Sequence, residues 1–133
     1  MVVGIVLLII AVAMLPPMLV DLAAGHPDWQ VFFLSAGLTA FVGLSLVLMN
    51  RGSVPTAELT VRQGFLLTTL IWLTTTVFAT LPLYYSSLEL GLTDAFFEAM
   101  SGITTTGSTV ISGLDSAPGG ILLWRALLQW LGG

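Results

Sequence analysis

Three long apolar stretches, the first two of them uncharged, dominate the first two thirds of the chain and are separated by short polar segments. They run from Val2 to Val20, from Trp29 to Met49 and from Val61 to Tyr85. Because ~20 apolar residues in a helix cross the ~30 Å hydrocarbon layer of a bilayer, each stretch predicts a transmembrane helix. Pro16-Pro17 and Pro82 remove backbone donors within the first and third stretches, so we expect kinks there.

The pattern changes after the third stretch. A short helix is predicted from about Asp94 to Ile103 with Thr93 as its cap, and it would rise only ~15 Å, half the thickness of a membrane. Thr104 to Thr109 follow without a large side chain, and then a turn-rich segment leads to a new apolar helix from Ile121. Irregular backbone at membrane depth survives only in protein or beside water. The pattern therefore predicts a re-entrant half-helix and a loop that lines a wet path.

Composition excludes a soluble domain. The 133 residues are 56% hydrophobic and 8% charged, against the ~25% charged residues of ordinary soluble domains. The chain has a net charge of -4 and lacks lysine. Because no cluster of basic side chains could bind along a phosphate backbone, nucleic-acid binding is not expected. Because cysteine is absent, thiolate metal sites and cysteine nucleophiles are excluded.

The few charges set the expected topology. Arg51 and Arg62 lie in the connection between the second and third stretches, and short cytoplasmic loops collect basic residues. We therefore expect the N-terminus inside and the polar turn between the first two stretches outside. Glu58 and Arg62 stand four residues apart, as suits the start of a helix.

The polar turn itself offers no obvious chemistry. Asp21 and Asp28 are interpreted as ordinary loop acids, and His26 as a solvated residue without a partner at metal spacing. An intramembrane protease would need a base at depth, and the single histidine lies in this turn, so we do not expect an enzyme.

The threonine-rich loop suits a potassium ion. A potassium filter replaces the hydration shell of the ion with backbone carbonyls, and Thr105-Thr106-Gly107 supplies carbonyls in series. Gly107 permits backbone angles that a side chain would obstruct. The short helix would also direct the negative end of its dipole toward the ion. Glu98, an acid within that helix, is expected to face protein or a vestibule.

These residues carry a family resemblance. The run DAFFEAMSGITTTGST, from Asp94 to Thr109, resembles the first pore loop of the Trk/Ktr/HKT potassium-transporter superfamily, and within it the bacterial TrkH subunits most closely. LLWRALLQWLGG, from Leu122 to Gly133, is similar to the start of the next helix in that family. Aligned with the potassium-channel filter TVGYG, the loop keeps only the first glycine.

The resemblance implies an all-α integral membrane fold. Residues 1–55 would form an N-terminal helix pair, and residues 56–133 a first helix–pore-loop–helix repeat that is incomplete at its second helix. It also implies that the filter is formed by the backbone carbonyls of Thr105, Thr106, Gly107 and Ser108. K⁺ would bind at Thr105 and Thr106. Further pore-lining candidates are Thr104, Thr109, Glu98 and Arg125.

The resemblance further implies K⁺ uptake, as in a symport system of the bacterial inner membrane. Its partners would be membrane lipid, the remaining pore repeats or a second copy in a homodimer, and a cytosolic nucleotide-binding regulatory subunit. No cofactor other than the transported K⁺ is expected. Since a filter wall needs four loops and one is present, we expect no transport by this chain alone.

Some alternatives stay open from sequence. The chain could be a non-transporting membrane protein that packs against partner helices through small residues. Glu98 could be a satisfied packing residue, and Arg125 could extend to the lipid headgroups.

Overall fold

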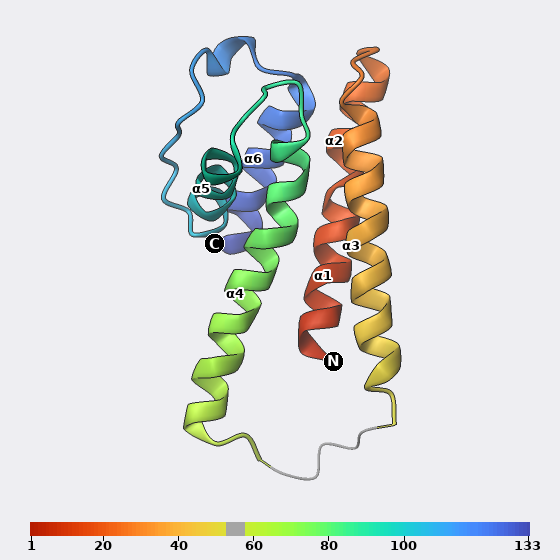
Figure 1. Cartoon of the computed structure of the whole chain (residues 1–133), viewed down its shortest axis with the longest axis vertical. Coiled ribbons are helices and arrows are strands. Elements are labelled where there is room, and N and C mark those ends of the chain that lie inside the picture. Colours follow the sequence, from red (N-terminus) through yellow and green to blue (C-terminus); the bar gives the residue numbers. More distant parts are fainter. Residues whose placement is uncertain (53–57) are drawn as a thin grey trace.

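The chain is helical in the computed structural model, which describes residues 1–52 and 58–133. In chain order the elements are α1 (Val2–Ala13), α2 (Leu15–Ala23), α3 (Trp29–Met49), α4 (Val61–Tyr84), α5 (Leu92–Ile103), the 3₁₀ turn η1 (Leu114–Ser116) and α6 (Gly119–Gly132). The expected boundary between residues 55 and 56 lies outside the described residues. Figure 1 shows α1 and α2 end to end with α3 beside them, and α4, α5 and α6 grouped next to this pair of spans.

Three membrane-length helices confirm the three predicted spans. They comprise Val2–Ala23, Trp29–Met49 and Val61–Tyr84, with mean hydropathies of 2.7, 2.2 and 1.6. The first span is interrupted at Met14, between α1 and α2 and just before the two prolines, as their missing donors predict. Large apolar side chains such as Phe41 and Phe65 are 70% and 74% exposed, as suits contact with lipid.

The N-terminal helix pair is held by a close approach of two backbones. A Cβ atom added to Gly4 would lie 2.7 Å from the carbonyl oxygen of Gly43, and one added to Gly43 would lie 2.9 Å from that of Gly4. Small residues allow such an approach in lipid, where packing rather than the hydrophobic effect holds helices together. Gly43 of α3 thus serves a helix contact within this chain.

Helix α4 begins with a capping box. Thr60 accepts a hydrogen bond from the Gln63 backbone, and the Gln63 side chain accepts one from the Thr60 N–H. The expected helical pairing of Glu58 with Arg62 is wrong, because Glu58 precedes the cap. Several threonine hydroxyls of α4 donate to the carbonyl one turn earlier, which satisfies them within the apolar span: Thr68, Thr69, Thr76 and Thr80.

Helix α5 is too short to span and lies across the long helices. Its 12 residues rise ~18 Å, and it is seen nearly end-on in Figure 1, where α4 is seen from the side. Gly91 is its N-cap, so the expected cap at Thr93 is wrong because Thr93 already lies in the first turn. In Figure 1 the segment between α4 and α6 starts and returns at the same end of the bundle.

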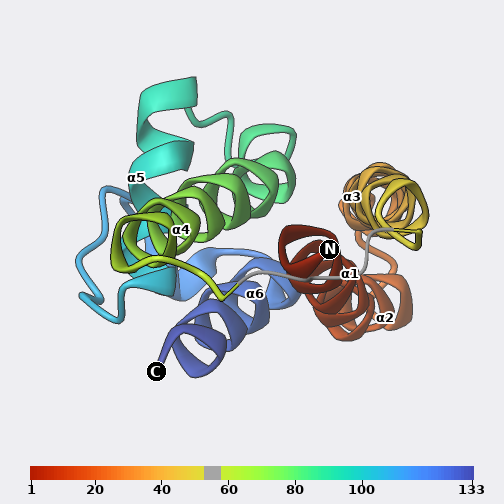
Figure 2. The same cartoon turned by 90° about the horizontal axis from the view of Figure 1, so that it is seen from below.

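Trp124 of α6 joins the two groups of helices. Its side chain is fully buried, its Nε1 donates to the Ala79 carbonyl of α4 at 3.1 Å, and its ring meets Phe32 of α3 edge-on at 6.2 Å. Figure 2, seen from below, shows α6 between the α4 and α5 group and the α1 and α2 pair. The core around Trp124 therefore fixes α6, and with it the loop that α6 supports.

Candidate functional site

The threonine-rich loop begins with a Schellman motif at the C-terminus of α5. The Thr105 N–H donates to the Gly102 carbonyl at 2.9 Å, and the Thr106 N–H donates to the Ser101 carbonyl at 3.0 Å. Thr105 occupies the left-handed region with a φ of 59°, where helix ends usually place glycine. A β-branched residue in this region is strained, and strained backbone concentrates at functional sites.

The loop turns its amides inward and leaves its carbonyls free. The Gly107 N–H also donates to the Ser101 carbonyl, at 3.3 Å, and Gly107 has a φ of 77°. Within the described part of the chain, no donor hydrogen-bonds to the carbonyl oxygens of Thr105, Thr106 or Gly107. All three residues are exposed. The structure thus brings together three consecutive unpaired carbonyls directly beyond the C-terminus of a helix.

The hydroxyl groups of the loop are mostly engaged. Thr104 donates to the Met100 carbonyl at 2.7 Å, and its hydroxyl lies 2.9 Å from that of Thr106. The Ser108 carbonyl accepts the Ser101 hydroxyl at 2.7 Å, so one of its two lone pairs is occupied. The Ser108 carbonyl therefore differs from the three carbonyls that precede it.

Glu98 binds the segment of the loop that returns from the threonine run. It is 1% exposed, and its Oε1 accepts from the Thr109 hydroxyl and the Val110 N–H, both at 2.5 Å, and from the Ile111 N–H at 3.3 Å. Its Oε2 accepts from Arg125 Nε at 2.9 Å. Of the two orientations expected for Glu98, the structure shows the one that faces protein. The carboxylate joins α5, the loop and α6.

Arg125 and Thr109 are part of this same network. The Arg125 side chain is 12% exposed and contacts Glu98, so extension to the headgroups is not what the structure shows. The Thr109 hydroxyl donates to Glu98 and does not project freely from the loop. Both residues, which the sequence named as pore-lining candidates, support the loop through Glu98.

Glycine contacts hold α5 against α6. A Cβ atom on Gly102 would lie 3.0 Å from Leu128 Cβ, and one on Gly132 would overlap the Ile103 carbonyl oxygen. The backbone of α6 therefore contacts the end of α5 directly. Sequence reasoning missed the roles of Ser101, Gly102 and Gly132 in holding the loop and α5 in place. Their small size, next to a predicted filter, was a signal for close packing.

The segment that joins α2 to α3 is more structured than the sequence suggested. Asp21 is 0% exposed and its Oδ1 accepts the Gly120 N–H at 2.8 Å, while Asp28 is 4% exposed and accepts the Ser87 N–H and hydroxyl. The interpretation of both as ordinary loop acids is wrong, because each pairs with backbone that is distant in the sequence. His26 lies close to both acids, so its expected isolation is wrong as well.

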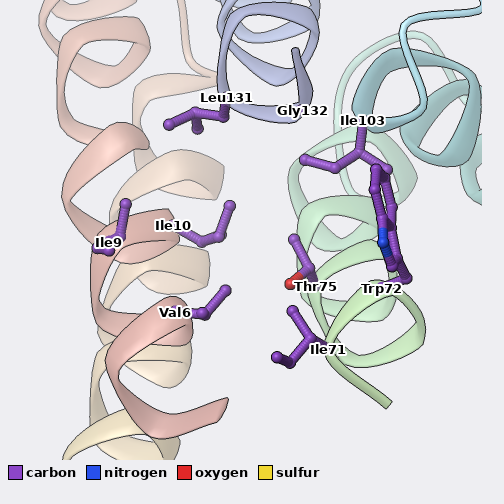
Figure 3. Close-up of a pocket in the computed structure, with 9 residues that line it drawn as sticks. All are labelled: Val6, Ile9, Ile10, Ile71, Trp72, Thr75, Ile103, Leu131 and Gly132. Carbon is purple, nitrogen blue, oxygen red and sulfur yellow. The ribbon is translucent and has the colours of Figure 1, made fainter. Parts of the chain in front are cut away.

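An apolar cavity of about 340 Å³ lies beside the C-terminus of α5. Figure 3 shows side chains from α1, including Ile10, facing Trp72 and Thr75 of α4 across it, with Ile103 and Leu131 at one end. The lining side chains are aliphatic apart from the Thr75 hydroxyl and the Trp72 indole. A cavity with so few oxygen atoms cannot replace the hydration shell of a cation, so the ion-binding candidates stay in the loop.

The fold and the site define a multi-pass membrane protein with three spans and a short helix–loop element. A protein-family model described as "TrkH: Cation transport protein" matches residues 29–133, and the chain belongs to this family. The family is one of cation transporters and not of enzymes.

The curated relatives are named as Trk system potassium uptake proteins. The chain is 42% identical over 131 residues to the Trk system potassium uptake protein TrkH of Halomonas elongata, covering 98% of this chain and 27% of that protein. It is 40% identical to TrkH of Escherichia coli, again with 27% of the relative covered, and 36% identical to TrkG of the same organism. The chain thus spans about a quarter of the length of the curated relatives that it matches.

A solved structure has the same fold. The crystal structure of the potassium transporter TrkH from Vibrio parahaemolyticus superposes with a TM-score of 0.89 at 39% identity, over 98% of this chain and 28% of that chain. The arrangement of spans, transverse helix and loop is therefore similar to that of one part of a potassium transporter.

Proposed function

We propose that residues 56–133 form the first helix–pore-loop–helix repeat of a potassium uptake transporter. The carbonyls of Thr105, Thr106 and Gly107 line one side of the K⁺ path. The relatives are named as potassium uptake proteins, which supports the choice of ion. Residues 1–55 serve as a helix pair that holds this repeat through the Trp124 core.

The observation that carries this proposal is the set of unpaired carbonyls. The N–H groups of residues 105–107 donate back to Ser101 and Gly102, so the oxygens of the same peptide groups, which include those of Thr105 and Thr106, point away from the helix end. The Gly107 carbonyl, in the next peptide group, also accepts no hydrogen bond within the described residues. Unsatisfied carbonyls are costly in lipid and are tolerated where they replace the hydration of an ion. The C-terminus of α5, directly before the loop, adds negative potential at the same place.

The other predicted site residues take supporting roles in this mechanism. Ser108 contributes the remaining lone pair of its carbonyl at the end of the filter segment, and Thr104 caps the half-helix. Glu98 and Arg125 fix the return of the loop by their ion pair rather than binding the ion.

One loop forms one side of a filter, so this chain alone does not conduct K⁺. Rubidium uptake in bacteria that lack their own potassium transporters tests this statement. The 133-residue chain is expected to give background uptake, whereas a chimera in which it replaces the matched region of Escherichia coli TrkH restores uptake. Uptake by the chain alone would refute the statement, and an inserted but inactive chimera would count against the assigned repeat.

Gly107→Ala in the chimera tests the filter itself. A Cβ atom there would have Gln129 Nε2 at 3.8 Å as its nearest contact, so the substitution meets no steric barrier and acts through the backbone. The left-handed region costs a non-glycine residue about 1–2 kcal/mol, so the loop relaxes and its carbonyls turn away. Rubidium uptake is expected to be lost with normal membrane insertion.

Gly25→Ala is the matched control for this experiment. Gly25 has a φ of 70° and nothing within 4 Å of an added Cβ atom, so it carries the same backbone cost away from the loop. Its uptake should stay near that of the unmodified chimera. Equal uptake in the two variants would favour the alternative of a membrane protein that packs with partners and does not transport.

The proposed setting is the bacterial inner membrane with the N-terminus in the cytoplasm. Arg51 and Arg62 flank the connection between α3 and α4 and support a cytoplasmic position for that end of the bundle. The turn between α2 and α3 and the entrance to the threonine-rich loop then face outside. A cytosolic nucleotide-binding regulatory subunit and a second pore subunit are the proposed partners, on the strength of the family alone.

A further inference from the structure

A carboxylate–imidazole cluster lies where the N-terminal helix pair meets the pore repeat. It consists of Asp21 at the end of α2 and of His26 and Asp28 in the turn before α3. One ligand atom from each residue lies within 4.8 Å of the other two. The cluster contacts the pore repeat directly, since Asp21 accepts the Gly120 N–H and Asp28 accepts the Ser87 N–H.

Asp21 leaves one buried oxygen without a partner. Its side chain is 0% exposed and its Oδ1 is bonded to Gly120, but its Oδ2 has no hydrogen bond in the described part of the chain. Burying a charged oxygen in this way is costly unless a proton or a cation compensates it. The orphaned oxygen belongs to the same carboxylate that faces His26 and Asp28, so it points to a missing ligand within the cluster.

The other two side chains are arranged as metal ligands usually are. His26 Nδ1 lies 3.7 Å from Asp28 Oδ2, and its lone pair accepts the Asp28 N–H at 3.3 Å, so a metal bound at this nitrogen would replace that hydrogen bond. The Asp28 carboxylate is oriented by Ser87, whose hydroxyl donates to Oδ2 at 2.9 Å. Hydrogen bonds from outside a metal site commonly orient its ligands in this manner.

We propose that Asp21, His26 and Asp28 bind a divalent transition-metal cation such as Zn²⁺. Two carboxylates and one imidazole are typical ligands of Zn²⁺ and leave a fourth position for water. Ligands about 2.0 Å from Zn²⁺ stand roughly 3.3 Å apart, so small side-chain rotations close the site from its present spacing. K⁺ does not fit this cluster, because it prefers neutral oxygen atoms to imidazole nitrogen. The bound cation ties the α2–α3 turn to the first turn of α6.

Metal binding to the purified full chain in lipid nanodiscs tests the proposal without any transport assay. After treatment with a chelator and its removal, Zn²⁺ is titrated calorimetrically and the thermal unfolding midpoint is recorded with and without Zn²⁺. One Zn²⁺ per chain is expected, with a higher unfolding midpoint. His26→Ala, at a partly exposed position that should fold, is expected to weaken binding by at least about tenfold.

Two further variants make the test decisive. Asp21→Asn keeps an oxygen for the Gly120 N–H but removes the charge, so Zn²⁺ binding should be lost while the metal-free protein stays folded. Asp115→Asn removes an exposed acid of η1 outside the cluster and should bind Zn²⁺ as the unmodified chain does. Absent or unsaturable Zn²⁺ binding, or equal binding by His26→Ala and the unmodified chain, would overturn the assignment and leave Asp21 as a buried protonated acid.

Discussion

Replacing Glu98 by glutamine isolates the ion pair that holds the loop to α6. The Glu98 side chain is 0% exposed and that of Arg125 is 12% exposed, so the two charges compensate each other out of contact with bulk water. The glutamine side chain could still accept from Thr109 and Val110 through its oxygen, but its amide would place a donor against the Arg125 donor. Removing one partner of a buried pair costs about 3–5 kcal/mol, and we expect the lower end because the loop contacts survive.

The assay is thermal unfolding in lipid nanodiscs, combined with rubidium uptake by the chimera. At about 2–4 °C per kcal/mol, Glu98→Gln should lower the unfolding midpoint by at least ~6 °C. Uptake should fall because α5 and the loop lose their ion pair with Arg125 of α6. Arg62→Gln, which replaces an exposed arginine on α4, is the control and should change stability by less than about 0.5 kcal/mol.

A double-mutant cycle with Arg125→Gln decides whether the two residues act together. We expect the double variant to be more stable than the sum of the single effects by about 0.5–3 kcal/mol, because the second substitution removes a charge already left unpaired. Additive effects, or a Glu98→Gln midpoint equal to that of Arg62→Gln, would refute the assignment of Glu98 as the anchor of the loop.

Three further substitutions probe the helices and the contacts between them. Gly120→Ala places a Cβ atom against the Asp21 carboxylate, where an atom does not fit, so it should lower the unfolding midpoint. Gly64→Ala on α4 meets nothing within 4 Å and should instead stabilise the helix by about 1 kcal/mol. Trp124→Phe removes the hydrogen bond to the Ala79 carbonyl and should cost about 1 kcal/mol, measured in the same unfolding assay; an unchanged midpoint would contradict that bond.

Local sequence signals predicted the elements of this protein well. Apolar length located the three spans, because the bilayer thickness fixes how many residues a helix needs to cross it. The prolines located the interruption near Met14, and the glycine and threonine content located the irregular segment after Ile103. The family resemblance in that segment is confirmed by the match over residues 29–133.

The tertiary structure decided what the polar residues do. Sequence reasoning interpreted Asp21 and Asp28 as loop acids, since nothing near them in the chain reveals a partner, yet they bind Gly120 and Ser87. Glu98 likewise acquires its role from Arg125, which lies 27 residues further along.

The sequence by itself therefore determined which segments enter the membrane and which segment exposes its backbone. The length of each apolar run decides the first, and the local content of residues that tolerate irregular backbone decides the second. Only the tertiary structure decided which carbonyls stay unpaired and which charges are buried. A hydrogen bond depends on the position of both partners in space, and the packing of α6 against α5 and α2 sets those positions.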